Sequence, residues 1–308
     1  MTRLDRGWST VLLDDATQVR VRNIGEEVAV GDRVDVSADG ERVERVHPRT
    51  SALTRRASFE GSRGLRQVIA ANIDTVFVVH SLTADANERR LERELVLAFD
   101  SGAEPVVLLT KSDAVDESSV HEMRERLAHV TMDVPVIAVS SVTGVGLDEV
   151  RAHTRPGETV AIIGASGVGK STLVNALVGH EVQRTGEVRD DDQRGRHTTV
   201  AAELIGLPGG AWLLDTPGLR AVTLWTSDAG IERAFADVFD VADTCRFRDC
   251  RHLDEPGCAV RDAIEAGTLR ADRLEAMRRL VAEEAAVEDE QTERERKSSR
   301  RGFRRSRP

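Results

Sequence analysis

Apolar and polar positions follow two different periods along the chain. In the first part, short alternating runs predict strands at residues 9–14, 18–23, 27–36 and 41–46. The turn Ala38-Asp39-Gly40 lies between the last two runs, and Asp-Gly in that setting is a strong hairpin signal. Several short strands at such close spacing predict a small antiparallel β-barrel, a fold that binds RNA in some proteins and protein in others.

From Asn72 onward, continuous apolar runs alternate with amphipathic ones. The apolar runs predict strands at 73–82, 105–110, 135–139, 159–163 and 211–215. The amphipathic runs predict helices at 88–102 and 117–130, with a short helix after Gly146 and another after residue 170. Apolar strands separated by helices predict a parallel α/β sheet covered on both faces, with ligands at the carboxyl ends of the strands.

The segment after the strand at 159–163 has the G-x-x-x-x-G-K-S pattern of a phosphate loop. Its glycines let backbone N–H groups wrap phosphates, and the following helix adds a favourable dipole. In this pattern the lysine reaches the β- and γ-phosphates and the serine hydroxyl coordinates Mg²⁺. The predicted nucleotide-binding residues are Gly164, Ala165, Ser166, Gly167, Val168, Gly169, Lys170 and Ser171.

A second loop predicts that the base is guanine. The strand at 105–110 leads into Thr110, Lys111, Ser112 and Asp113. The Asp113 carboxylate can accept hydrogen bonds from N1–H and the exocyclic amine of guanine, a pair of donors that adenine does not offer. We expect the Lys111 stem to lie along the base plane. The loop behind the base is predicted at Ser140 and Ser141, after the strand at 135–139.

The order of these loops is unusual. The base loop precedes the phosphate loop, whereas most GTPases have the phosphate loop first. Moving the chain ends in this way preserves a sheet but changes what is tethered to it. Here Asp215-Thr-Pro-Gly218, predicted to hold a magnesium-linked aspartate and a γ-phosphate-sensing glycine, leads directly into a cysteine-bearing segment.

The sequence identifies the residues that catalyse hydrolysis less directly than those that bind the nucleotide. A threonine between the phosphate loop and Asp215 is expected to complete the Mg²⁺ shell, and we prefer Thr199 over Thr198. Leu219 occupies the position where many GTPases carry a water-orienting glutamine, and leucine cannot orient water. His197 is the nearest candidate replacement, with a solvated loop histidine as the alternative.

All three cysteines of the chain cluster with one histidine, at Cys245, Cys250, His252 and Cys258. An odd, clustered set is a poor disulfide framework. Three thiolates and one imidazole fill the four tetrahedral positions of a structural zinc ion. The C-x4-C-x-H-x5-C spacing is unusual for a zinc finger, so coincidental buried cysteines remain the alternative.

Composition and charge narrow the class of protein. Hydrophobic residues make up 40% of the 308 residues and charged residues 31%, which is typical of a soluble globular protein. No apolar run reaches the roughly 18 residues of a membrane span, and the first residues lack a signal-peptide core. The net charge is −10, but residues 42–66 contain seven arginines against two acids, and the tail from 294 is also arginine-rich. Since screening erases charge beyond roughly 8–10 Å, these runs favour RNA, with solvated surface as the alternative.

Together, these residues resemble the ribosome small-subunit-dependent GTPase A family, the circularly permuted GTPases of bacterial ribosome assembly. The resemblance extends over nearly the whole chain, through VGDRV, HPR, TKSD, GASGVGKST, GRHTT, DTPG and the cysteine cluster. It implies an OB-fold, a permuted GTPase domain and a zinc domain, and GTP hydrolysis stimulated by the small ribosomal subunit during its late maturation. It adds Thr172 to the GTP contacts. Thr110 replaces the usual asparagine, which implies somewhat weaker guanine binding.

The expected organisation is an OB-fold RNA-binding domain at 1–66, a permuted GTPase domain at 67–222, a mostly helical zinc domain at 223–293 and a basic, disordered tail at 294–308. The expected partners are GTP or GDP with Mg²⁺, one Zn²⁺, and the small subunit with its rRNA. We expect a cytoplasmic monomer away from membranes. Two alternatives are a nucleotide-gated RNA-binding module without hydrolysis and a small-molecule kinase, although the kinase does not explain the base loop.

Overall fold

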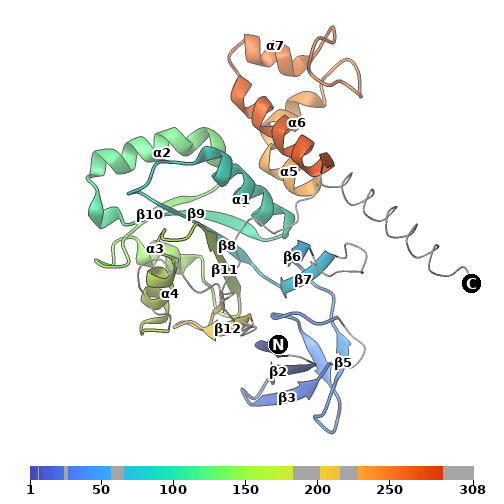
Figure 1. Cartoon of the computed structure of the whole chain (residues 1–308), viewed down its shortest axis with the longest axis vertical. Coiled ribbons are helices and arrows are strands. Elements are labelled where there is room, and N and C mark those ends of the chain that lie inside the picture. Colours follow the sequence, from blue (N-terminus) through green and yellow to red (C-terminus); the bar gives the residue numbers. More distant parts are fainter. Residues whose placement is uncertain (6, 24–26, 57–65, 183–201, 216–227, 287–308) are drawn as a thin grey trace, which may run out of the picture.

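A single sheet runs through the computed structural model, which describes residues 1–5, 7–23, 27–56, 66–182, 202–215 and 228–286 (Figure 1). Its parallel strands are β8 (Thr75–Ser81), β9 (Glu104–Thr110), β10 (Val136–Val139), β11 (Thr159–Gly164) and β13 (Trp212–Asp215). Antiparallel strands extend it through β12 (Glu203–Gly206), β1 (Arg3–Asp5), β2 (Trp8–Leu12) and β3 (Gln18–Arg22). The order is β10-β9-β8-β11-β13-β12-β1-β2-β3.

Helices cover both faces of the parallel strands, as the apolar runs predict. One face carries α1 (Glu88–Asp100) and α2 (Glu117–Thr131), and the other carries α3 (Leu147–Ala152) and α4 (Lys170–Val178). Side chains alternate between the two cores along β8: Val76 and Val78 pack on the α1 side, and Phe77 and Val79 on the α4 side. The carboxyl ends of these strands therefore meet at one edge, between the two helical layers.

The N-terminal part forms antiparallel strands around a small core of its own. Beside the sheet strands β1 to β3, β4 (Val34–Val36) pairs with β5 (Val43–Val46) in a separate two-stranded sheet, and β6 (Ala52–Arg56) pairs with β7 (Arg66–Ala71) in another. The core consists of buried Met1, Val11, Val21 and Val43. The predicted turn at Ala38-Asp39-Gly40 is confirmed: Gly40 has φ +73° and its N–H donates to the Ser37 carbonyl oxygen at 2.7 Å.

The prediction of one strand over 27–36 is wrong for residues 27–33, because Asp32 is buried there and organises a loop. Its carboxylate accepts from the Ala29 N–H at 2.7 Å and pairs with Arg49 through Nε at 2.7 Å and Nη2 at 2.9 Å. Gly31, with φ +89°, makes the bend. Arg49 belongs to the arginine-rich run at 42–66 that favours RNA. In the structure, however, Asp32 neutralises its guanidinium, and the pair fixes the loop.

The C-terminal part is helical, as predicted. It contains α5 (Asp228–Ala234), α6 (Ala236–Ala242), α7 (Ala259–Glu265) and a last helix over residues 271–286. Its core is formed by side chains including Ile231, Phe235, Val238, Cys258 and Val260. Across the described residues, no helix has both the length and the apolar character required to cross a membrane.

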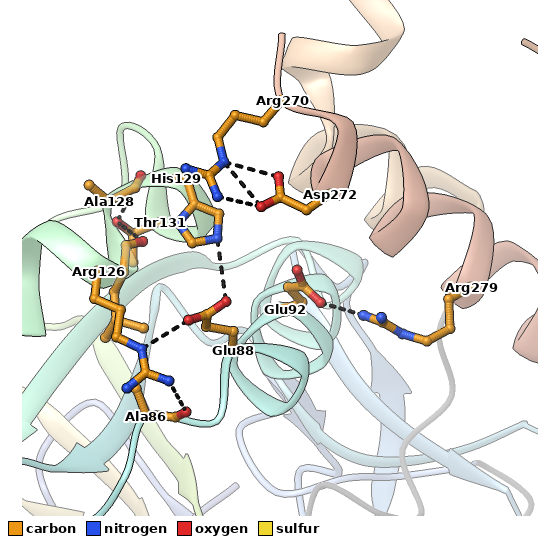
Figure 2. A network of polar contacts seen from close by, with 11 residues as sticks. Ala86, Glu88, Glu92, Arg126, Ala128, His129, Thr131, Arg270, Asp272 and Arg279 are labelled. Atoms are coloured by element: carbon orange, nitrogen blue, oxygen red, sulfur yellow. Dashed lines mark hydrogen bonds and ion pairs between the residues drawn. The ribbon is translucent and has the colours of Figure 1, made fainter. Parts of the chain in front are cut away.

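Helix α1 joins this C-terminal part to the sheet. Leu91, Leu95 and Ala98, spaced four and three residues apart, pack on the sheet side, whereas Val96 belongs to the C-terminal core. Figure 2 shows the polar side of the contact, where Glu92 on α1 pairs with Arg279 of the last helix at 2.5 Å. The C-terminal helices are thus packed on α1 through both apolar and charged groups.

Candidate nucleotide and metal sites

The predicted phosphate loop lies between the end of β11 and the start of α4, which are the flanking strand and helix that its pattern requires. Gly164 has φ +148°, and a Cβ placed on it would lie 2.4 Å from the Val79 carbonyl oxygen, so only glycine fits beside β8. Gly169, at the start of α4, has φ +96°. The Lys170 ammonium lies within the loop, 3.0 Å from the Gly164 carbonyl oxygen. This is the strand, loop and helix arrangement that binds phosphate groups.

The predicted base loop is attached directly to the phosphate loop. The Thr110 hydroxyl, at the buried end of β9, lies 2.5 Å from the Val168 carbonyl oxygen and 3.1 Å from that of His80. Lys111 has a left-handed backbone, with φ +62°, and its Nζ donates to the Gly167 carbonyl oxygen at 3.0 Å. Two side chains of one loop therefore fix its position relative to the other.

The Asp113 carboxylate is oriented by the loop after β10. The Ser140 hydroxyl donates to Asp113 Oδ1 at 2.5 Å. The Ser140 oxygen in turn accepts from the N–H groups of Val142 at 3.2 Å and Thr143 at 3.1 Å. Ser140 is fully buried, whereas Ser141 is partly exposed and, in the described part of the chain, forms no hydrogen bond with the Asp113 carboxylate. Of the two predicted serines, only Ser140 holds the carboxylate.

Several predicted residues lie outside the described part of the chain. They are His197, Thr198, Thr199, Gly218 and Leu219. Asp215 ends β13, and only its backbone is described. β13 lies beside β11, so its end reaches the same edge of the sheet as the phosphate loop.

The structure brings together the four predicted metal ligands. The ligand atoms of Cys245, Cys250, His252 and Cys258 all lie within 4.8 Å of one another. His252 Nδ1 is 3.6 Å from the Cys245 sulfur and 3.4 Å from the Cys258 sulfur. Tetrahedral zinc with ordinary bond lengths puts sulfur and nitrogen about 3.6 Å apart, so the cluster fits this ion.

In the cluster, the pKa of His252 is shifted in the direction that suits a bound cation, whereas that of Cys250 is shifted the other way. Burial raises the pKa of the Cys250 thiol to about 11, and hydrogen bonding with Cys258 and Cys245 acts in the same direction. Burial, assisted by the nearby Arg278 charge, lowers the pKa of His252 and favours the neutral imidazole that a metal needs. A bound cation reverses the preference for neutral thiols, because it stabilises the thiolates.

Comparisons with known proteins agree with this geometry. A family model described as RsgA GTPase matches residues 46–225. The chain is also 46% identical, over 267 residues, to a Methanosarcina acetivorans protein called small ribosomal subunit biogenesis GTPase RsgA, covering 85% of this chain and 71% of that protein. The chain belongs to the RsgA GTPase family. A Streptomyces avermitilis protein of the same name is 42% identical and is matched over 79% of its length.

Two solved structures share the fold of this chain. YjeQ from Thermotoga maritima superposes with a TM-score of 0.69 at 26% identity, covering 92% of this chain and 96% of that one. YloQ, described as a circularly permuted GTPase, superposes with a TM-score of 0.65 at 23% identity, covering 91% and 92%. Membership in this family makes the chain a GTP hydrolase that uses Mg²⁺ with its nucleotide.

Two contacts in this RsgA-family chain were not evident from the sequence. Thr110 has a structural role, because its hydroxyl links the two nucleotide loops. Arg278 donates to the carbonyl oxygens of Arg251 at 2.7 Å and His252 at 2.6 Å, and so holds the cysteine loop against the last helix. A threonine at the end of a buried strand could have suggested the first contact, whereas no sequence signal marks the second.

Proposed function

We propose that this enzyme hydrolyses GTP during late maturation of the small ribosomal subunit, to which it binds through rRNA, and that the subunit stimulates hydrolysis. One observation carries the proposal: the chain has 41–46% identity to relatives called small ribosomal subunit biogenesis GTPases, over most of its length. The pre-assembled base and phosphate loops support it, because a site that needs little rearrangement can respond to a partner added in trans.

The roles we propose for individual residues follow the two loops. Asp113, held by Ser140, accepts from the guanine base, and the Lys111 stem packs along it. Lys170 binds the β- and γ-phosphates, and Ser171 coordinates Mg²⁺. The remaining proposed nucleotide contacts are Thr110, Ser112, Ser141, Gly164, Ala165, Ser166, Gly167, Val168, Gly169 and Thr172.

We assign the response to the γ-phosphate to the segments on either side of β12 and β13. In this proposal Thr199 and Asp215 complete the magnesium environment, the latter from a distance, and Gly218 senses the γ-phosphate. His197 orients the attacking water that Leu219 cannot orient. Magnesium, when bound, neutralises charge on the transferred phosphoryl group.

We further propose that the N-terminal strands form an OB-type barrel that contacts RNA, within a domain at 1–66, followed by domains at 67–222 and 223–293 and a basic tail. The separate core of Val11, Val21 and Val43 supports an independent N-terminal unit. The Cys245–Cys258 cluster holds one structural zinc, because four protein ligands leave no open position. The proposed working form is a cytoplasmic monomer.

The decisive experiment measures GTP turnover with and without purified small subunits. Stimulation of roughly 10³–10⁵-fold is expected when a partner completes a GTPase site. Lys170→Ala serves as the control, because it removes the phosphate-binding ammonium while leaving the fold, which thermal unfolding verifies. Turnover that stays slow at saturating subunit concentrations contradicts the proposal and favours a nucleotide-gated binding module.

A further inference from the structure

The outer face of strands β2 and β3 carries an indole ring in contact with two arginines. The strand register places Trp8 directly opposite Arg22, and Thr10 opposite Arg20. Side chains alternate along a strand, and Val11 and Val21 point into the N-terminal core. Trp8, Arg20 and Arg22 therefore lie on the face directed away from that core, on the outermost two strands of the sheet.

The two guanidinium groups rest on the same ring. Arg20 Cζ lies 5.1 Å and Arg22 Cζ 5.0 Å from the centre of the Trp8 ring. Both distances are within the roughly 6 Å range of cation–π attraction. Contact with a rigid ring restricts two long side chains that would otherwise be free. The ring thus holds two positive charges in place without neutralising either of them.

Neither guanidinium has a carboxylate partner within 4.0 Å among the described residues. Three other N-terminal arginines differ in this respect. Arg49 is paired with Asp32 at 2.7 Å, Arg3 with Asp5 at 3.7 Å and Arg42 with Glu44 at 3.8 Å. The charge of this face is therefore available to an external anion, whereas three other N-terminal arginines are already matched.

We propose that this face, defined by Trp8, Arg20 and Arg22, binds single-stranded RNA. Arginine suits phosphate because its planar fork donates several hydrogen bonds while its flat side packs on a ring. Trp8 is partly exposed, and its remaining surface offers a base a place to stack. An acidic peptide would use the charges but not the ring, whereas an RNA strand presents a phosphate and a base in every nucleotide.

The proposal deepens the function proposed above, since subunit RNA would be the ligand. It assigns the contact to a surface outside the arginine-rich run at 42–66 that the sequence singles out. Trp8 has two roles in this arrangement: it fixes the two arginines that contact phosphate, and its ring offers a surface to a base. An aromatic substitute should preserve that effect, and a small residue should remove it.

The test uses the full-length protein and a fluorescein-labelled, 12-nucleotide single-stranded RNA, with the affinity measured over a series of salt concentrations. Each lost phosphate contact reduces the slope of log affinity against log salt by about 0.7 for a single strand. Arg20→Gln/Arg22→Gln should therefore reduce the slope by about 1.4. Trp8→Ala should give part of this loss, and Trp8→Phe should retain the wild-type slope.

The matched control is Arg89→Gln/Arg124→Gln, which removes two exposed arginines from α1 and α2. It should leave the slope unchanged. An equal loss in the control, or an unchanged slope in Arg20→Gln/Arg22→Gln, overturns the proposal. So does normal RNA binding combined with weakened binding to intact subunits, because that result assigns the face to a protein contact.

Parallel measurements keep this outcome separate from that of the proposed function. GTP affinity and thermal unfolding verify that each variant is folded. Subunit-stimulated turnover of the wild type tests the proposed function by itself. Two results together would separate the proposals: no stimulation of turnover by subunits, and the expected loss of RNA affinity in Arg20→Gln/Arg22→Gln. This combination refutes the ribosomal role but supports the proposal that this face binds RNA.

Discussion

The Thr110 hydroxyl lies 2.5 Å from the Val168 carbonyl oxygen, so one buried hydrogen bond joins the proposed base loop to the phosphate loop. These loops lie far apart in the sequence and come from different strands, β9 and β11. Because β8 separates the two strands in the sheet, the contact spans its carboxyl edge. The bond therefore sets the distance between the proposed base loop and the phosphate loop independently of a bound nucleotide.

Replacing Thr110 with valine tests this link. The side chain keeps its shape, but the buried carbonyl oxygens of Val168 and His80 lose their hydroxyl partner. We expect a loss of about 1–3 kcal/mol in the free energy of unfolding and weaker binding of GTP and GDP. Denaturant unfolding and fluorescent-nucleotide titration measure the two effects. Thr110→Ser keeps the hydroxyl and should stay close to wild type; equal behaviour of the two variants would refute the link.

Asp113 and Ser140 should act as a pair in base recognition. Asp113→Asn removes an acceptor for the guanine N1–H, so GTP affinity should fall while ATP affinity stays low. Ser140→Ala leaves the carboxylate but removes its donor, 2.5 Å away, and should weaken GTP by a smaller factor. A double-mutant cycle on GTP affinity gives the coupling, expected at about 0.5–3 kcal/mol for groups in contact. Strict additivity would show that Ser140 does not position Asp113.

Metal removal should affect the C-terminal helices more than the sheet. Cys258 is buried in the same core as Phe235 and Val260, so the ligand cluster and the core form together. Chelation, or Cys258→Ser, should raise hydrogen exchange in α6 and α7 while β8 and β11 stay protected. Elemental analysis should find about one zinc per chain. Full protection of α7 after complete zinc removal would contradict a structural role.

The backbone arrangement of the proposed nucleotide loops was predictable from the sequence, because their patterns specify local backbone geometry. Gly164 is an example, since the close approach of Val79 allows no side chain there. The parallel strands were likewise evident from uninterrupted apolar runs such as that of β8, which needs burial on both faces. In these segments the sequence signal lies within a few neighbouring residues, even where the structural reason, such as Val79 beside Gly164, is distant in the sequence.

Contacts between distant residues were not predictable in the same way. Asp32 and Arg49 pair across a loop, and no local pattern showed that this arginine would be neutralised. Strand β12 was also missed, because its antiparallel pairing with both β13 and β1 depends on the N-terminal strands joining the sheet. The three residues of the proposed RNA-binding face come together only through the register of β2 and β3.

The contact between α1 and the last helix should depend on pH through Glu92. Burial raises the pKa of this carboxyl, and the attraction of Arg279 does not fully offset the effect. A raised folded-state pKa means that the charged form is disfavoured on folding. The contribution of Glu92 to stability is therefore fully present below its unfolded pKa, about 4.3, and is lost as pH rises through the folded value.

Glu92→Gln removes the charge and keeps the shape of the side chain. At neutral pH the variant should be more stable than wild type, because it no longer places a partly desolvated charge between α1 and the last helix. Arg279 is partly exposed and can be solvated when its partner is neutral. Urea unfolding from pH 7 down towards pH 4 should show the difference shrinking as Glu92 becomes protonated in the folded protein. Destabilisation by Glu92→Gln at pH 7 would instead show that the pair with Arg279 outweighs burial, and that this ion pair holds the C-terminal helices on α1.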